Sequence, residues 1–263
     1  MDKQDREALK EAENILENPS LTARISDTIG TPVGWAISKL PSGAKDAVSW
    51  ATKKSLTTAL KAAVLTMNKK PSSKPNRWLH HGAVVVTGGV GGFFGLSALA
   101  VELPISTGIM LRSIADIARS EGENIRSIET QLACLEVFAL GGPKLSDDDS
   151  DSAYYMVRAT LARAVSEAVE WIAEKGIIEE GAPAIVRLIS GLAPRFGIVV
   201  SEKAVAQLIP AVGAAGGATI NYLFMDHFQS VAKGHFTVRR LERKYGKELV
   251  QQEYMTISQE KNS

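Results

Sequence analysis

The sequence TGGVGGFFGLSALAVELP, which runs from Thr87 to Pro104, contains five glycines and no charged residue before Glu102. A run of this composition fits a membrane-spanning helix, a phosphate-binding loop or a close-packed core helix. A second uncharged run extends from Ala204 to Met225 and also carries glycines four residues apart. Because a glycine stripe lets two helices approach closely and a helix that is apolar all round belongs at the centre of a bundle, we favour a pair of core helices.

The first run does not meet the requirements of a nucleotide-binding loop. A dinucleotide fingerprint needs the spacing G-x-G-x-x-G, and Phe94 stands where the third glycine belongs after Gly89 and Gly91. A Walker motif needs a lysine directly after its last glycine, and no lysine stands there. We therefore expect no bound nucleotide.

A membrane span is the alternative for the first run. Residues 82–101 are long enough, since crossing a bilayer takes about 20 apolar residues, and Trp78 flanks one end as a residue at the membrane interface does. Six glycines in this segment weaken its insertion, and Pro210 interrupts the second run. An intermediate interpretation is a soluble bundle whose glycine-rich hairpin can meet a bilayer.

Apolar residues recur three and four positions apart along most of the chain, and no segment shows sustained alternation with a period of two. We therefore predict an all-α fold, a multi-helix bundle around two glycine-rich apolar helices. Pro104 is expected in the first turn of its helix, where a missing N–H costs nothing. Helices are expected at about residues 2–17, 20–30, 44–67, 104–121, 125–138 and 153–175. Short helices are expected within 181–197, followed by a second apolar helix capped by Ser201 and a basic helix over 232–255.

The chain has 263 residues, of which 45% are hydrophobic, and this is enough for a sizeable core. The prediction divides it into two parts. Residues 1–44 form amphipathic helices that are expected to dock loosely, and residues 45–263 form the main helical domain.

The charge and the cysteine content indicate the compartment. A net charge of +1 gives no overall attraction to nucleic acid or to anionic lipid, so such a partner would need a local patch. Cys134 is the single cysteine and cannot form an internal disulfide, which suits a reducing compartment. The first residues lack the apolar stretch of a secretory signal. We expect a cytoplasmic protein that associates peripherally with the inner membrane.

Polar residues gather after each apolar run. The candidate polar cluster consists of Glu102, Arg112, Asp116, Arg119, Glu129, Asn221 and Asp226. Carboxylates beside arginines can perform acid/base chemistry or hold an anionic head group, and they also tie helices together as ion pairs. No histidine pair has the spacing of a zinc motif, so we predict no metal and no cofactor.

The last predicted helix carries a basic stripe of Lys233, Arg239, Arg240, Arg243 and Lys244. Such a stripe can contact the phosphates of anionic lipids. The alternative is a solvated amphipathic face whose long side chains snorkel into water. We expect a membrane surface or a membrane protein as the partner and no specific nucleic acid.

Three segments together resemble the EcsC protein family of bacteria: GGVGGFFGLSALAVELPISTGIMLRSIADIARSEGEN, ETQLACLEVFALGG and GAAGGATINYLFMDHFQSVAKGHFTVRRLERKYG. The resemblance covers about Lys45 to Gly246. The family takes its name from the third gene of an operon whose other two genes encode the ATPase and membrane subunits of an ABC transporter. The resemblance therefore implies a cytoplasmic or membrane-associated protein that acts near secretion machinery, and it supplies no catalytic residues.

Two functional hypotheses follow. The first is a binding or interaction protein that associates peripherally with the membrane and is linked to ABC transport or secretion. The second is a hydrolase or metal-dependent enzyme that uses clustered carboxylates at the end of the glycine-rich hairpin. The enzyme requires those carboxylates to converge beside a cavity, whereas the binding protein does not.

Overall fold

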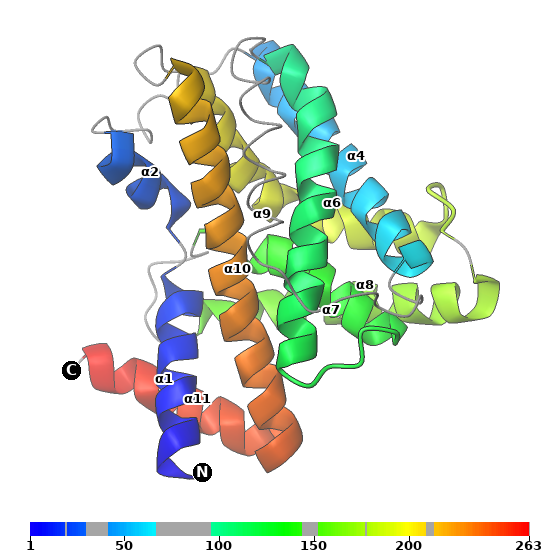
Figure 1. The fold of residues 1–263 in the computed structure, drawn as a ribbon. Helices are drawn as coiled ribbons and strands as arrows, with labels where there is room; N and C mark the ends of the chain where they lie inside the picture. Colours follow the sequence, from blue (N-terminus) through cyan, green and yellow to red (C-terminus); the bar gives the residue numbers. More distant parts are fainter. Residues whose placement is uncertain are drawn as a thin grey trace.

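The computed structural model describes residues 1–18, 20–29, 42–66, 96–143, 152–176, 178–208 and 213–262. These residues form nine α-helices and no strand, so the predicted all-α bundle is confirmed. Figure 1 shows the long helix α10 running through the molecule with other helices packed along it. The helices are α1 (Lys3–Glu17), α2 (Leu21–Ile29), α4 (Ser42–Thr66), α6 (Leu96–Ser120), α7 (Ile128–Leu140), α8 (Ala153–Lys175), α9 (Pro183–Leu208), α10 (Gly213–Tyr245) and α11 (Lys247–Asn262).

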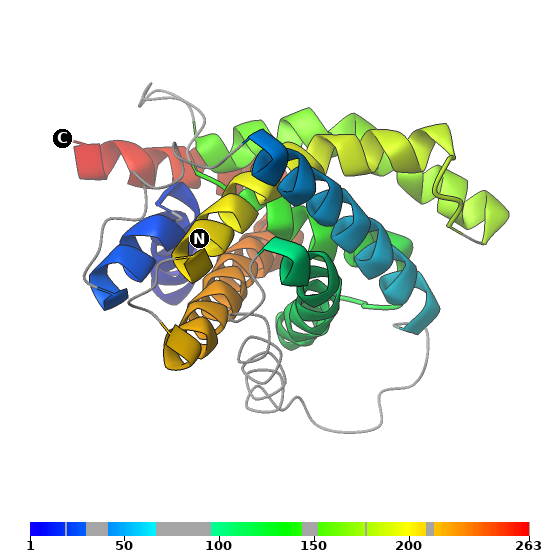
Figure 2. The same ribbon diagram turned by 90° about the horizontal axis from the view of Figure 1, so that it is seen from above.

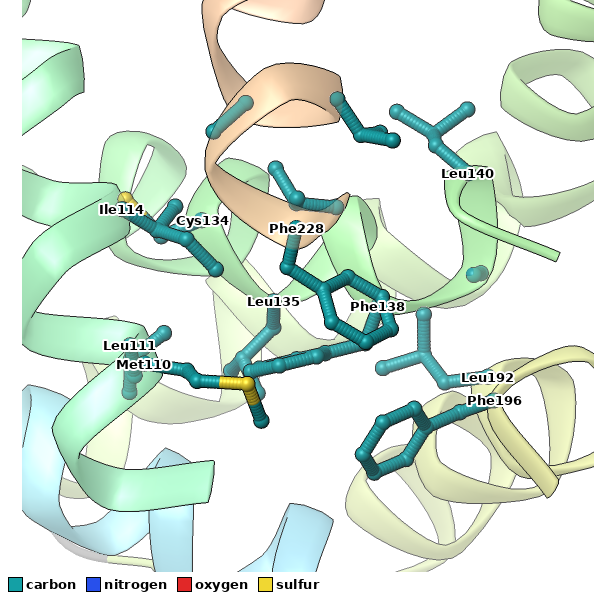
Figure 3. Packing of buried hydrophobic residues seen from close by; sticks show 14 of the residues in the cluster. Met110, Leu111, Ile114, Cys134, Leu135, Phe138, Leu140, Leu192, Phe196 and Phe228 are labelled. Carbon is teal, nitrogen blue, oxygen red and sulfur yellow. The ribbon is translucent and has the colours of Figure 1, made fainter. Parts of the chain in front are cut away.

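A helix without glycine, α7, lies at the centre of the described core. Every residue from Thr130 to Leu140 is buried, and the helix contacts α4, α6, α8, α9 and α10. Its composition accounts for this position, because a helix that is apolar almost all round is stable only when it is surrounded. Figure 3 shows Phe138 of α7 beside Phe196 of α9 and Phe228 of α10, with ring centroids 4.8 and 5.3 Å away.

The two glycine-rich runs that shaped the prediction are placed only in part. Residues 87–95 of the first run lie outside the described residues, and α6 begins at Leu96. The second run is not a helix of its own, because it is divided between the end of α9 and the start of α10. From Gly213, α10 continues without a break into the predicted basic helix and ends at Tyr245.

Local capping signals place several helix ends where the sequence predicts them. The Ser20 hydroxyl accepts a hydrogen bond from the Ala23 N–H at 3.2 Å at the start of α2, and Ser152 is the N-cap of α8. Gly122 and Gly176 follow α6 and α8 with φ of 82° and 67°. Glycine adopts this left-handed conformation without a steric penalty, which is why these helices end there.

Two prolines lie inside helices, so the prediction that they start or break helices is wrong. Pro104 is internal to α6, and Pro194 is internal to α9, which is one helix of 26 residues rather than several short ones. An internal proline removes one main-chain hydrogen bond, but both helices bury apolar faces along their length, and this burial outweighs the loss. Ser201, predicted as a cap, is also inside α9 and donates to the Gly197 carbonyl.

The N-terminal helix α1 packs against α10, α11 and α8. Leu9, Ala12 and Leu16 of this helix are buried. Gly234 on α10 allows the close approach, because a Cβ there would lie 3.0 Å from Leu16 Cγ and 3.3 Å from the Ala12 carbonyl oxygen. The apolar spacing of α1 therefore marks a packed face of the same body as α10.

Candidate functional site

Glu102, the first member of the predicted polar cluster, is neutralised inside the core. Its Oε1 lies 2.6 Å from the Nζ of Lys203 on α9, and both side chains are buried. The same Nζ lies 4.7 Å from the ring centroid of Phe224. Burial lowers the pKa of Lys203, and the neighbouring carboxylate opposes that shift. Lys203 was not among the predicted site residues, and its ion pair gives Glu102 a structural role.

Two of the other predicted acids, Asp116 and Asp226, are bound to different cations. Asp116 pairs with Arg119 at 3.0 Å along α6, and Asp226 pairs with Arg24 of α2 at 2.5 Å. Arg112 and Glu129 are exposed, and Asn221 is buried in α10. Within the part of the chain that the structure describes, no three His, Cys, Asp or Glu side chains are placed to hold a metal ion. The acids thus form separate ion pairs.

The five residues of the basic stripe all contact carboxylates of the same molecule. Two glutamates in the turn between α6 and α7 receive most of these contacts. Glu121 pairs with Lys233 and with Arg240, the latter at 2.8 Å, and Glu123 pairs with Arg239 at 2.7 Å and with Arg243. Lys244 instead binds Asp5 of α1 at 2.6 Å. The stripe therefore joins α10 to the α6–α7 turn and to α1.

The pKa values of the two turn glutamates are lowered by these contacts. Burial alone raises the pKa of a carboxyl group, but Lys233 and Arg240 hold the pKa of Glu121 below its ordinary value of 4.5. Arg239 does the same for Glu123 against a similar cost of burial. Both glutamates are therefore ionised acceptors, and the cations around them are held in fixed positions.

Beside this network lies a cleft of about 350 Å³, which we call the α8–α10 cleft. It is lined by Arg158, Arg239, Glu242, Arg243 and Lys247. Arg158 of α8 makes a two-point contact with Glu242, at 2.7 and 3.0 Å. Lys247 is exposed and makes no ion pair with any residue that the structure describes. Glu242 thus pairs with Arg158, and Glu123 pairs with Arg239 and Arg243 from outside the lining. The four lining cations outnumber these two carboxylates, so the cleft has an excess of positive charge.

A buried polar chain lies behind Arg158, one of the residues that line the cleft. Arg158 donates to the Tyr154 hydroxyl at 3.2 Å, and that hydroxyl lies 3.0 Å from Nδ1 of His235. Burial, together with the charges of Arg158 and Arg239, holds the pKa of His235 well below its ordinary value, so the ring is neutral. Its Nε2 atom has no hydrogen-bond partner among the described residues. This chain therefore fixes Arg158 from the interior of the bundle without adding charge.

A carboxylate from α1 fixes the helix that carries Arg158. Glu17 accepts a hydrogen bond from the Ser152 hydroxyl at 2.5 Å, from the Ala153 N–H at 3.0 Å and from the Tyr254 hydroxyl at 3.1 Å. A negative charge at a helix N-terminus is favourable because of the unpaired N–H groups there. Glu17 thereby ties α1 and α11 to the start of α8 and holds that wall of the cleft in place.

Sequence reasoning found Arg239 and Arg243, and also placed Lys247 on the basic helix, but it missed Arg158 as their neighbour. The spacing along α10 could have shown that His235 and Glu242 lie beside Arg239, because the three residues are four and three positions apart and share one face of the helix. No comparable local pattern shows that α8 faces this stripe, since Arg158 and Glu242 are 84 residues apart.

Comparison with known proteins identifies the family. The family model described as the EcsC protein family matches residues 3–241. The chain belongs to the EcsC protein family. The match begins at residue 3, so the N-terminal helices are part of the EcsC region, although the resemblance was expected to begin near Lys45. No curated protein and no solved structure matches the chain.

One helix of the described residues of this EcsC protein is long and apolar enough to cross a membrane. It spans Pro183–Gln207 in α9, and 44% of its most apolar window is buried inside the bundle. A core helix of a soluble protein has the same properties, and Lys203 and Glu202 lie within this one. Length and composition alone therefore do not make α9 a membrane span.

Proposed function

We propose that this EcsC protein is a binding protein that holds a phosphate-bearing anion in the α8–α10 cleft and works peripherally at the inner face of the membrane. The observation that carries the proposal is the lining of the cleft, in which three arginines and one lysine face a single glutamate. The volume of about 350 Å³ falls in the range of small-molecule sites. The link to ABC transport or secretion is a further prediction from the family resemblance.

The arginines favour phosphate as the bound group. A guanidinium has five N–H donors in a planar fork that matches the oxygens of phosphate. The described bonds of Arg239 to Glu123 use its Nε and one terminal nitrogen, which leaves donors for a ligand. Because Glu242 and Glu123 already hold Arg158 and Arg239 in position, little side-chain entropy is lost when an anion binds.

The alternative, an enzyme using clustered carboxylates, has less support. Glu102, Asp116 and Asp226 each bind a separate cation. None of these acids lines the α8–α10 cleft. A binding function needs no such convergence, and the cleft supplies the positive charge that an anion requires.

Titration of the intact protein with inorganic pyrophosphate and glycerol 3-phosphate tests the proposal, with binding measured by calorimetry at low and high salt. We expect binding that weakens as salt screens the charges. Lys247→Gln removes a cleft cation that has no described ion pair, so folding is preserved and the Kd rises about fivefold, equivalent to about 1 kcal/mol. The matched control is Lys10→Gln, which removes an exposed lysine from α1, outside the cleft.

A second arm distinguishes a soluble ligand from a lipid head group. Vesicles of phosphatidylcholine with phosphatidic acid present the same phosphate on a membrane, and vesicles of phosphatidylcholine alone are the control. If Lys247→Gln weakens binding to the vesicles but no soluble phosphate binds, the ligand is a head group. The proposal fails if neither source binds at low salt, or if Lys247→Gln and Lys10→Gln bind as the unchanged protein does.

A further inference from the structure

The surface between α4 and α9 contains a second hollow, which we call the α4–α9 groove. It has a volume of about 510 Å³, and its lining includes Lys45 and Lys53 from α4 together with Ala193, Pro194, Gly197 and Ile198 from α9. No carboxylate is present among the described residues that line it. The groove therefore combines an apolar floor with positive charge, which distinguishes it from the mixed charges of α10.

Small residues keep the floor of the groove shallow. A Cβ at Gly197 would meet no atom closer than the Thr52 side chain at 3.9 Å. Pro194 has no N–H, so its exposed side offers only ring carbons. A ligand can thus reach the α9 main chain along this face.

Exposed apolar side chains continue the groove along α9. Pro194 and Ile198 are four residues apart and share one face of the helix, and Val186 lies two turns earlier, beyond the exposed Ser190. Val186 is 48% exposed and Ile198 is 43% exposed. Less than half of the most apolar window of α9 is buried, 44%, so part of the outer surface of this helix is apolar. Exposed apolar side chains gathered beside a groove are typical of an interaction site.

Lysines surround this apolar face on α4. Lys45 and Lys53 line the groove, and Lys54 places its Nζ 4.6 Å from the ring centroid of Trp50, which is 53% exposed. One exposed carboxylate, Asp46, lies on the same stretch of α4. Lys45 and Lys53 make no ion pair with a residue that the structure describes, unlike the cations of α10. Their charges are therefore available to a partner.

We infer that the α4–α9 groove is the surface by which this protein lies on an anionic bilayer, with Ile198, Pro194 and Val186 entering the boundary between head groups and acyl chains and the lysines contacting lipid phosphates. The inference rests on the proposed membrane association and names the face responsible. Lysine and apolar residues on one face are typical of proteins that bind in the membrane interface. Each lysine near such a surface strengthens binding about fivefold.

The fold favours a protein that lies on the bilayer over one that crosses it. Lys203 on α9 is buried in an ion pair with Glu102 of α6, so α9 stays part of the bundle. Figure 1 shows the first turns of α4 at the top of the molecule and the C-terminal end of α10 at the bottom, and Figure 2 shows α4 crossing α9. Arg239, Glu242 and Arg243 near that end of α10 line the cleft. A membrane bound at the groove would leave the α8–α10 cleft open to the cytoplasm.

Vesicle flotation tests the inference with the full chain at low salt. The probes are vesicles of phosphatidylcholine, with and without phosphatidylglycerol. Ile198→Asp places a charge in the groove, and Leu249→Asp is the matched control, because Leu249 of α11 is also 43% exposed. We expect Ile198→Asp to reduce the fraction bound to anionic vesicles at least tenfold, whereas Leu249→Asp floats as the unchanged protein does. Lys45→Gln with Lys53→Gln should weaken binding about 25-fold.

The outcomes separate this inference from the proposed function. If the unchanged protein floats and Ile198→Asp floats equally well, the groove assignment is wrong while membrane association stands. If the unchanged protein does not float with any vesicle, both are overturned. Loss of binding by Ile198→Asp with normal phosphate binding in solution supports the groove and leaves the cleft unaffected.

A second measurement avoids dependence on a variant that fails to fold. A polarity-sensitive fluorophore attached at Ser190→Cys, in the lining of the groove, should shift to the blue when anionic vesicles are added. Cys134 does not compete for the label, because it is fully buried. The same label at Thr256→Cys on α11 should show no shift. Equal shifts at both positions would contradict the proposed orientation.

Discussion

Replacement of the buried lysine of α9 tests the energetics of the core. Lys203 is 0% exposed and its partner Glu102 is 5% exposed, with 2.6 Å between Nζ and Oε1. Lys203→Met keeps the volume of the side chain but leaves the carboxylate without its cation in a medium that solvates charge poorly. Breaking one partner of such a pair costs about 3–5 kcal/mol, a large part of a typical unfolding free energy of about 5–15 kcal/mol.

The double variant Lys203→Met with Glu102→Leu supplies the decisive comparison. Replacing a whole buried pair by apolar residues is often neutral or stabilising by about 1–4 kcal/mol. We therefore expect the double variant to be more stable than Lys203→Met by at least about 3 kcal/mol. Equilibrium unfolding in urea, followed by circular dichroism at neutral pH, measures the unfolding free energies of the unchanged protein, of both single variants and of the double variant. A single variant that costs under about 1 kcal/mol, or a double variant that costs the sum of both singles, would refute the reasoning.

Three further predictions concern other buried groups. Burial lowers the pKa of His227 from 6.5 to about 4. The unfolded chain therefore binds the extra proton first, and the stability that is present above the unfolded pKa is lost as the pH falls. Between about pH 7 and 5.5 the contribution of His227 to the unfolding free energy falls by about 1.2 kcal/mol, and His227→Gln should remove this part of the pH dependence in urea titrations. Gly141→Ala would place a Cβ 2.6 Å from the Phe228 ring and should lower the unfolding free energy by about 1–3 kcal/mol. The control Gly108→Ala, whose Cβ would have no atom within 4 Å, should stabilise the protein by up to about 1 kcal/mol. Equal effects of the two substitutions would contradict the packing around Gly141. Glu17→Gln removes the charge at the start of α8 and should cost about 1–2 kcal/mol by the same assay; an unchanged midpoint would argue against the capping role.

Local chemistry made much of the helical layout predictable. Ser20 and Ser152 begin helices because a hydroxyl can accept from the free N–H groups of the first turn. Gly122 and Gly176 follow helix ends because their φ angles are positive. The same reasoning failed at Pro104 and other internal breakers, where packing along the whole helix outweighs one lost hydrogen bond.

The candidate site was less predictable because its partners are distant in the chain. The residues of the basic stripe were recognised on α10, but their charges looked available to a membrane. Their ion pairs with Glu121 and Glu123 span more than 100 residues, and no periodicity within one helix reveals which other helix lies opposite. The burial of α7, which contains no glycine, at the centre of the described core was not predicted. Residues 87–95 of the first glycine-rich run lie outside the described residues, so the position predicted for that run stays a prediction.

The contact between the first and last helices has a consequence for synthesis. Arg6 binds Glu253 and Glu260, and Lys261 binds Glu13, so α1 gains these partners only after almost the entire chain has been made. At about 5–20 residues per second, a ribosome needs on the order of 10–50 s to reach the final helix. During that interval the apolar stripe of α1 lacks α10 and α11, and the nascent chain is expected to depend on a chaperone that shields its N-terminal end.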